Sequence, residues 1–237
     1  RMRLPVTIVE KIRSALGENF LLIFRLSMID LIPNGSSHDE VVILAKKLEA
    51  AGINIINTGI GWHEARIPTI ATSVPPAAFS WVTKKLMGKI TIPLITSNRI
   101  NTPEKVEEVL NSKCADLVSM ARPFLADPDF VNKASQDKSE LIAPCIACNQ
   151  ACLDHTFKGK ISSCLVNPRA CYEDELELKL VSNPKKIAIV GAGPAGLSAA
   201  ITAAQVGHQV TLFEKEQELG GQLNLAKKVP GKEEFWG

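Results

Sequence analysis

The sequence has few aromatic residues, only 5% of the chain, and a single tyrosine, Tyr172. Its formal net charge is only +2, and no basic run is interleaved with aromatic residues. Because nucleic-acid-binding domains usually carry a strongly basic face, we expect no nucleic-acid partner. No signal-peptide pattern follows Arg1. We therefore expect a bacterial-type cytoplasmic location, where disulfides are rare.

One apolar stretch, residues 187–207, has about the length of a membrane-spanning helix. It contains three glycines and a proline within six positions, and short polar residues follow. This composition favours a glycine-rich turn followed by a helix, so we expect no membrane partner.

Apolar and amphipathic segments alternate through the first 135 residues. The expected strands are residues 20–27, 53–58, 92–97 and 115–120. Between them, Ser37 and Glu40 predict a capping box at the start of one helix, and Pro103 predicts the first position of another. Such a repeat predicts a parallel sheet with helices outside it, either half of a doubly wound sheet or half of a (β/α)8 barrel. Under the barrel interpretation the chain is a piece of a longer protein that continues on both sides.

Polar side chains follow the expected strands, where barrel active sites lie. Arg25 closes the first strand, and the later strand ends carry His63, Glu64, Arg66, Asn98, Arg99 and Arg122. Three arginines at strand ends favour anion binding, with Arg99 and Arg122 as phosphate ligands. His63 is a candidate for proton transfer. The alternatives are structural ion pairs for the arginines and a packed core position for the histidine.

Four of the six cysteines lie within twenty positions, separated by two, three and eleven residues: Cys145, Cys148, Cys152 and Cys164. A disulfide staple, a zinc site and an iron–sulfur cluster all remain open. The missing export signal disfavours disulfides, and zinc usually takes paired C-x2-C motifs. A compact run of three cysteines with a distant fourth favours an iron–sulfur cluster. Cys114 is expected to be a small core residue, and Cys171 has no assigned role.

A glycine-rich segment follows a short apolar strand at residues 186–190. Gly191, Gly193 and Gly196 have the G-x-G-x-x-G spacing, and Glu214 ends the next expected strand. The glycines would admit a dinucleotide pyrophosphate at the start of a helix, and Glu214 would bind a ribose diol. The alternative is a glycine-rich turn without a ligand.

Under the barrel and iron–sulfur interpretations, these features predict an α/β fold in three parts. Residues 1–138 would be the C-terminal half of a (β/α)8 barrel, and residues 139–184 an iron–sulfur segment and linker. Residues 185–237 would begin a Rossmann-like dinucleotide-binding domain.

Five motifs carry a resemblance to a known family: NTGIGWHEARIPTIAT, SMARPFLADP, CIACNQACLD, SCLVNPRAC and GAGPAGLSAAI. With them, the chain resembles the bacterial 2,4-dienoyl-CoA reductases, iron–sulfur relatives of old yellow enzyme. The resemblance implies an FMN-binding barrel, a 4Fe–4S cluster and an FAD domain, with NADPH as the electron donor. Trimethylamine dehydrogenase and the enoate reductases share this architecture.

The resemblance also implies roles for individual residues. Arg25 would lie near the flavin ring, and Asn98, Arg99, Ala121 and Arg122 would hold the FMN phosphate. The FAD contacts would be Gly191, Gly193, Pro194, Ala195, Gly196, Glu214, Gly221 and Gln222. The cluster ligands would be Cys145, Cys148, Cys152 and Cys164. His63 would be catalytic, and Glu64, Ala65, Arg66 and Ile67 would line the substrate site.

The implied reaction is reduction of a 2,4-dienoyl-CoA thioester, so the expected partner is an acyl-CoA. Hydride from NADPH would reach FAD, and single electrons would cross the cluster to FMN. His63 would help to supply the proton with a tyrosine that lies earlier in the family's barrel. The alternatives are a related ene or enoate reductase, an amine dehydrogenase, and a nucleotide-binding electron-transfer or zinc module without catalysis.

Overall fold

The computed structural model describes residues 2–62 and 65–229. The chain divides into two compact units, Arg1–Ala147 and Cys148–Gly237. The division falls inside the cysteine-rich segment, directly before Cys148, rather than at either end of it. Each unit is described by itself.

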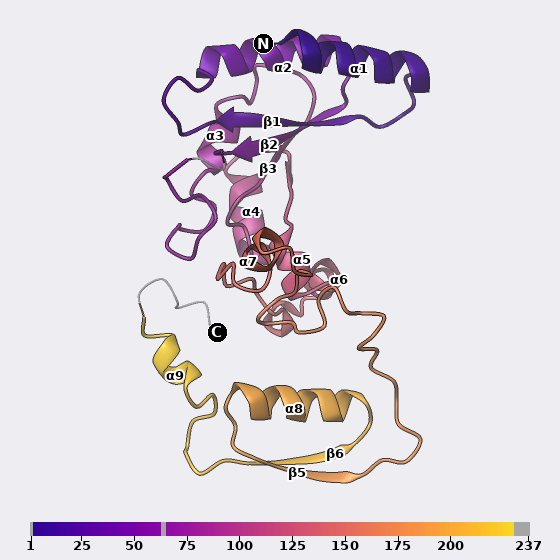
Figure 1. Cartoon of the computed structure of the whole chain (residues 1–237), viewed down its shortest axis with the longest axis vertical. Helices are drawn as coiled ribbons and strands as arrows, with labels where there is room; N and C mark the ends of the chain where they lie inside the picture. Colours follow the sequence, from indigo (N-terminus) through magenta and orange to yellow (C-terminus); the bar gives the residue numbers. More distant parts are fainter. Residues whose placement is uncertain (1, 63–64, 230–237) are drawn as a thin grey trace. The chain divides into compact units, whose positions relative to one another are not determined.

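The first unit is built on a parallel four-stranded sheet (Figure 1). Its strands are β1 (Ile23–Ile29), β2 (Ile55–Ile60), β3 (Leu94–Thr96) and β4 (Leu117–Val118), in the order β1-β2-β3-β4. All three neighbouring pairs are parallel, as the alternating pattern predicted. The carboxyl ends of all four strands therefore meet at one edge of the sheet.

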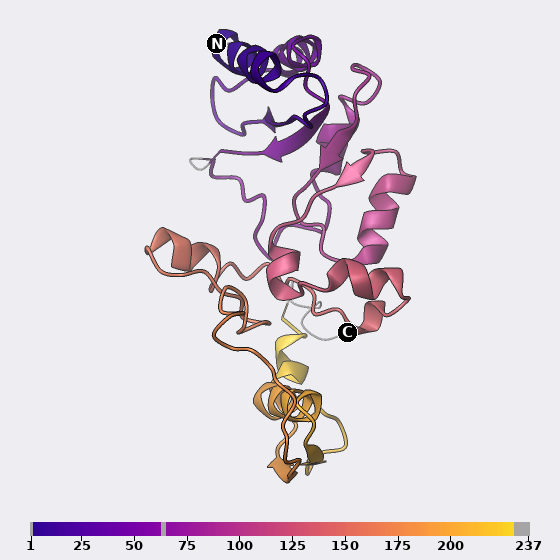
Figure 2. The ribbon, with the colours of Figure 1, turned by 90° about the vertical axis from the view of Figure 1, so that its right-hand side faces the viewer.

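Helices connect the strands of this unit. They are α1 (Arg3–Leu16), α2 (His38–Ala50), α3 (Ser80–Lys84), α4 (Pro103–Asn111), α5 (Arg122–Ala126) and α6 (Phe130–Ser135), followed by the 3-10 helix η1 (Ser139–Leu141). Helices α1 and α2 lie side by side over β1 and β2 (Figures 1 and 2).

The expected helix starts are confirmed. At α2, the Ser37 hydroxyl accepts from the Glu40 N–H, and the Glu40 carboxylate accepts from the Ser37 N–H. At α4, Pro103 occupies the first turn, and the Thr102 hydroxyl accepts from the Lys105 N–H. These local bonds satisfy N–H groups that the helix itself cannot pair.

The two faces of the sheet differ. Side chains that point toward the helices are buried, among them Leu26, Ile56 and Leu94. On the opposite face Arg25 is exposed and Asn57 is half-buried, and the two are register partners. The helix-facing side of the sheet is therefore the core side, whereas the opposite face carries polar side chains.

The strands begin two or three residues later than expected. Arg13 explains this for β1, because its guanidinium donates to the carbonyl oxygens of Gly17, Glu18 and Phe20 and holds this stretch as a loop. Arg25 therefore lies inside β1 and does not close it, which corrects the position predicted for it. Arg13 also donates to the Gly52 carbonyl and to Asn54 Oδ1, so it ties α1 to the loop that enters β2.

The second unit contains α7 (Leu153–Phe157), β5 (Lys186–Val190), α8 (Pro194–Gln205), β6 (Gln209–Phe213) and α9 (Leu223–Ala226). Strands β5 and β6 form a parallel pair, and α8 connects them and packs on them (Figure 1). This strand–helix–strand order confirms the elements expected around the glycine-rich segment. Within the described parts of both units, no helix is long and apolar enough to span a membrane.

Glu49 at the end of α2 holds the entrance to β3. Its Oε1 accepts from the Thr91 hydroxyl at 2.6 Å, the Thr91 N–H at 2.7 Å and the Ile92 N–H at 3.2 Å. Burial raises the pKa of Glu49, but the hydrogen bonds from Thr91 and Ile92 outweigh it, so the pKa lies below its ordinary value. Because folding lowers this pKa, the added stability is present above the pKa of the unfolded chain, about 4.3. It is lost as pH falls through the lower value of the folded state.

We expect Glu49→Gln in the full-length protein to reduce stability at neutral pH by about 1 kcal/mol, because a charged acceptor is replaced by a neutral one. The difference from wild type should shrink as pH falls below about 4. Thermal unfolding across this pH range measures it, with Glu107→Gln on the exposed side of α4 as the control. A difference that does not change with pH would contradict the assigned role of the Glu49 charge.

Candidate flavin and iron–sulfur sites

A cavity of about 350 Å³ opens at the carboxyl ends of the strands in the first unit. Its walls come from β1, β2, the loops after β2, β3 and β4 and the start of α5, together with one residue from the end of the unit. The lining residues are Arg25, Asn57, Ile70, Ser97, Asn98, Arg99, Ile100, Asn101, Ser119, Met120, Ala121, Arg122, Pro123 and Cys145. The structure thus brings together all five residues predicted for FMN, although they span almost a hundred positions in the sequence.

Arg25 and Asn57 form the floor contributed by β1 and β2. Arg25 Nη1 donates to Asn57 Oδ1 at 3.0 Å, and the Ser119 hydroxyl reaches the same oxygen at 3.4 Å. One amide oxygen thereby orients a guanidinium from β1 and a hydroxyl from the end of β4. The Arg25 charge is directed into the cavity and not toward a carboxylate.

The loop after β3 has an unusual backbone. Asn98 and Arg99 both adopt positive φ, 77° and 53°, which is uncommon for residues other than glycine. Arg99 is buried, its Nε donates to the Val74 carbonyl at 2.8 Å, and its own carbonyl accepts from the Ala77 N–H at 2.6 Å. The loop after β2 therefore holds Arg99 at both its side chain and its backbone.

Arg122, at the start of α5, is held by the same loop. Its Nη1 donates to the Ile70 carbonyl at 3.0 Å. Arg99 and Arg122 come from different strand ends, and Ile70 and Val74 position them from one segment. Fixed guanidinium groups bind phosphate better than mobile ones, because less side-chain freedom is lost on binding.

The charge of the cavity is one-sided. Of the fourteen lining residues that the structure describes, three are arginines and none is acidic. A cavity of this volume is in the range of small-molecule sites, and such a charge distribution favours an anionic ligand. The residues present therefore fit a phosphate-bearing group such as FMN.

Cys145 is buried in the wall of this cavity, and its carbonyl accepts from Asn101 Nδ2 at 2.9 Å. The other three predicted cluster ligands, Cys148, Cys152 and Cys164, lie half-buried in the second unit. None of the four forms a disulfide within the described residues, and these residues contain no group of three His, Cys, Asp or Glu side chains arranged for a single metal ion.

The Cys164 thiol of the second unit is partly buried. Burial raises the pKa of the Cys164 thiol, and the charges of Cys148 and Cys152 raise it further, although N–H groups of Val166 and Asn167 act in the opposite direction. As cysteines without disulfides, the four residues are of the donor type that an iron–sulfur cluster uses.

The glycine-rich turn of the second unit has a specific steric requirement. Gly191 has a φ of 96°, and a Cβ on Gly196 would lie 1.8 Å from the Gly191 carbonyl oxygen. Position 196 therefore admits only glycine. Pro194 and Ala195 form the first turn of α8, and a Cβ on Gly221 would approach the Cα of Gly193 at 3.2 Å. Gln222 precedes α9.

Glu214 follows β6, and its carboxylate closes onto the glycine turn. Its Oε2 accepts from the Ala192 N–H at 2.7 Å, and its Oε1 accepts from the N–H groups of Lys215 and Glu216. The hydrogen bond from the Ala192 N–H lowers the pKa of Glu214 most, and those from the Glu216 and Lys215 N–H groups lower it further. The ionised carboxylate can still accept from a ribose diol, because each oxygen has more than one lone pair.

The expected catalytic residue His63 and the expected substrate-lining residue Glu64 lie outside the described residues. Ala65, Arg66 and Ile67 belong to the loop after β2 but do not line the cavity, and Arg66 and Ile67 are exposed.

Sequence reasoning missed several polar residues of the site, namely Asn57, Thr72, Asn101 and Ser119. Asn57 had a recognisable signal, because it is a polar residue inside an otherwise apolar strand. Thr72 and Asn101 had none, because their partners lie more than forty positions away.

Comparison with known proteins decides the family. Residues 1–140 match the model of the NADH:flavin oxidoreductase / NADH oxidase family. The chain belongs to this family. Residues 189–234 match a NAD(P)-binding Rossmann-like domain, which agrees with the fold around the glycine turn. Membership of this family supports FMN as the ligand of the first unit.

Individual members are similar over nearly the whole chain. A metal reductase of Desulforamulus reducens is 42% identical over 99% of this chain and 35% of its own length. A NADH oxidase of Thermoanaerobacter brockii is 37% identical over 98% of this chain and 36% of its own length. The solved complex of 2-naphthoyl-CoA reductase with 2-naphthoyl-CoA superposes with a TM-score of 0.95 at 32% identity, over 99% of this chain and 36% of that one.

The family members differ in what they act on. They include a cinnamate reductase of Clostridium sporogenes, 31% identical, and an N,N-dimethylglycine/sarcosine dehydrogenase of Chromohalobacter salexigens, 30% identical. The chain spans about a third of the length of the curated relatives it matches.

The arginine arrangement leads to a first test. We expect Arg99→Gln and Arg122→Gln each to weaken FMN binding by about tenfold or more, the equivalent of about 1.5 kcal/mol or more for a lost charged hydrogen bond. Titration of the full-length apoprotein with FMN, followed by flavin fluorescence, measures the Kd. Arg3→Gln on the exposed side of α1 is the control and should bind FMN like wild type. Equal affinity in all four proteins would place the phosphate elsewhere.

The glycine turn leads to a second test in a matched pair. Gly196→Ala should disrupt the second unit, because its methyl group would overlap the Gly191 carbonyl. Gly193→Ala should fold normally, because Gly193 has an ordinary negative φ and no atom lies within 4 Å of the added Cβ. It should nevertheless bind FAD more weakly, because the methyl group would occupy the space that a bound pyrophosphate needs. Circular dichroism and FAD content measure the two effects. Unchanged FAD content in Gly193→Ala would contradict the dinucleotide assignment.

Proposed function

We propose that the protein containing this chain reduces a conjugated carbon–carbon double bond in an acyl-CoA thioester, with 2,4-dienoyl-CoA as the substrate. The cavity of the first unit carries the proposal, because three arginines line it together with Cys145. The motifs of the chain and the similarity to a protein described as 2-naphthoyl-CoA reductase support a CoA thioester.

The proposed roles follow from the positions of the side chains. Arg99 and Arg122 would hold the FMN phosphate, with Asn98 and Ala121 beside them. Arg25, oriented by Asn57, would stabilise negative charge that enters the cavity on reduction. FMN, when bound, would supply the hydride for the double bond.

Cys145, Cys148, Cys152 and Cys164 would hold a 4Fe–4S cluster that carries single electrons. The glycine turn and Glu214 of the second unit would hold FAD, which accepts hydride from NADPH. His63 is proposed as a source of the proton, and Glu64, Ala65, Arg66 and Ile67 as the adjoining substrate loop. Because the chain spans about a third of its relatives, these assignments concern the full-length protein.

A second function, reduction of a metal or oxidation of NADH without an organic acceptor, is favoured by the identity to the relatives described as a metal reductase and a NADH oxidase. It uses the same residues, since only the final acceptor differs. Enoate reduction and amine oxidation are the other alternative enzyme activities.

The test compares the rates at which the full-length protein reduces or oxidises different substrates. Anaerobically purified full-length protein should contain about four irons per chain and both flavins. With NADPH and then with NADH, its kcat/KM should be highest for a 2,4-dienoyl-CoA ester, by about tenfold or more over a free enoate, an amine or ferric iron, because a site that recognises the thioester discriminates against acceptors that lack it. Turnover of the free enoate without the thioester would reject the proposal. Stoichiometric zinc without iron would reject the cluster.

A further inference from the structure

Every second residue from Ile70 to Val74, in the loop after β2, makes a hydrogen bond to another segment of the first unit. The Ile70 carbonyl accepts from Arg122, and the Val74 carbonyl accepts from Arg99. Between them, the Thr72 hydroxyl lies 3.1 Å from both the Ile146 and the Ala147 carbonyl oxygens. One short segment thus contacts both proposed phosphate ligands and the residues directly after Cys145.

The stretch that Thr72 contacts has no regular structure of its own. From Ile142 to Ala147 the backbone is neither helix nor strand, so its carbonyl and N–H groups need partners from elsewhere. Ala147 moreover has a positive φ of 53°, which is a strained conformation for alanine. Side chains of the first unit must therefore hold this conformation.

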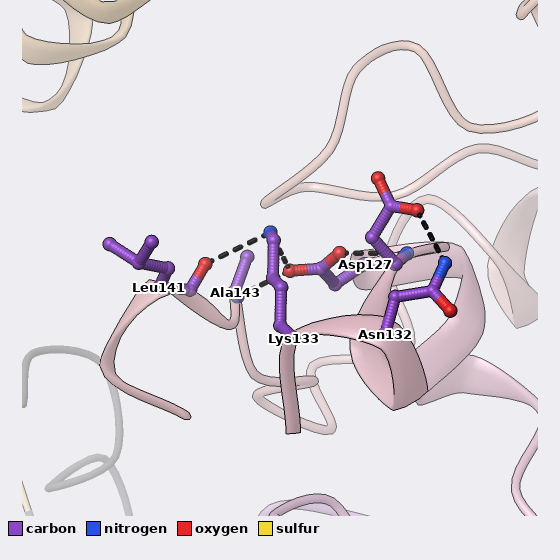
Figure 3. A network of polar contacts seen from close by, with 6 residues as sticks. Asp127, Asn132, Lys133, Leu141 and Ala143 are labelled. Atoms are coloured by element: carbon purple, nitrogen blue, oxygen red, sulfur yellow. Dashed lines mark hydrogen bonds and ion pairs between the residues drawn. The ribbon is translucent and has the colours of Figure 1, made fainter. Parts of the chain in front are cut away.

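Side chains supply these partners at the beginning of the stretch. Lys133 Nζ lies 2.5 Å from the buried Asp127 carboxylate and donates to the Leu141 carbonyl at 3.0 Å. Asp127 Oδ2 also accepts from the Ala143 N–H at 3.0 Å. Figure 3 shows this network, in which one ion pair holds the chain at two positions. The approach to Cys145 is thereby anchored to α5 and α6.

Two more side chains act at its end. Asn101 donates to the Cys145 carbonyl, and Thr72 donates to the two carbonyls that follow. The hydroxyl has a single hydrogen, so the two carbonyls share it. Among the described residues, Thr72 is the only one whose side chain donates to Ile146 or Ala147. Several side chains, in contrast, hold the backbone between Leu141 and Cys145.

We infer that Thr72 is a positioning residue that fixes the Cys145–Ala147 backbone for cluster binding and links it to the loop that holds Arg99 and Arg122. This inference rests on the proposed function, because it concerns a ligand of the proposed cluster. Partners of this kind beyond the ligands themselves commonly change metal retention by about tenfold to a hundredfold.

The comparison of Thr72→Val with Thr72→Ser isolates the hydroxyl. Valine keeps the shape of threonine but cannot donate, whereas serine keeps the donor. In the full-length protein we expect Thr72→Val to lose iron to a chelator about tenfold faster than wild type, and Thr72→Ser to lose it at nearly the wild-type rate.

A second measurement does not depend on the cluster. In iron-free protein, backbone amides of residues 145–148 should exchange hydrogen faster in Thr72→Val than in wild type or Thr72→Ser, while those of α1 should be unchanged. Circular dichroism verifies that all three proteins are folded. Thr72→Ala provides a smaller substitution if the valine variant fails to fold.

The outcomes separate the two claims. If wild type holds about four irons and all variants release iron and exchange amides like wild type, the role of Thr72 is overturned and the proposed function stands. If serine behaves like valine, the hydroxyl is not responsible and the inference is overturned. If wild type binds no iron, both the cluster and the inference are overturned.

Discussion

The loop between β2 and α3 must pair its backbone with side chains from neighbouring strand ends, and the geometry of the candidate site depends on this requirement. Its carbonyls at Ile70 and Val74 accept from Arg122 and Arg99, and so the same bonds that satisfy the loop also orient two cations. Buried carbonyls without partners are costly, which makes these bonds stable features of the fold. The cavity obtains a rigid, positively charged wall as a consequence.

The cysteine segment follows the same principle. Its first residues lack regular structure, and side chains from α5, α6 and the strand-end loops provide the partners. Cys145 is therefore held by the unit that contains the cavity, whereas Cys148, Cys152 and Cys164 belong to the other unit.

Local rules predicted the parts of the fold that depend on neighbouring residues. The capping box at Ser37 and Glu40, Pro103 at a helix start and the β-α order of both units are confirmed. Strand starts were less accurate, because Arg13 donates to the carbonyls of Gly17 and Phe20 and thereby delays β1. Strand propensity takes no account of such side-chain bonds to the backbone.

In the candidate site too, residues that follow a local rule were predicted and residues with distant partners were missed. The rule that polar residues gather at the carboxyl ends of parallel strands identified Asn98, Arg99 and Arg122, and the structure places all three at one cavity. Family membership supports the flavin chemistry, whereas the individual roles stay predictions. Thr72 could not be predicted, since its partners lie more than seventy positions away and a lone threonine in a loop has no distinguishing pattern.

The most direct test of the account is a crystal structure of the full-length protein loaded with its flavins and iron. The account predicts an FMN phosphate within hydrogen-bond distance of both Arg99 and Arg122, and an iron atom bound to Cys145. A flavin phosphate bound away from these two arginines, or a Cys145 thiol without iron, would contradict it.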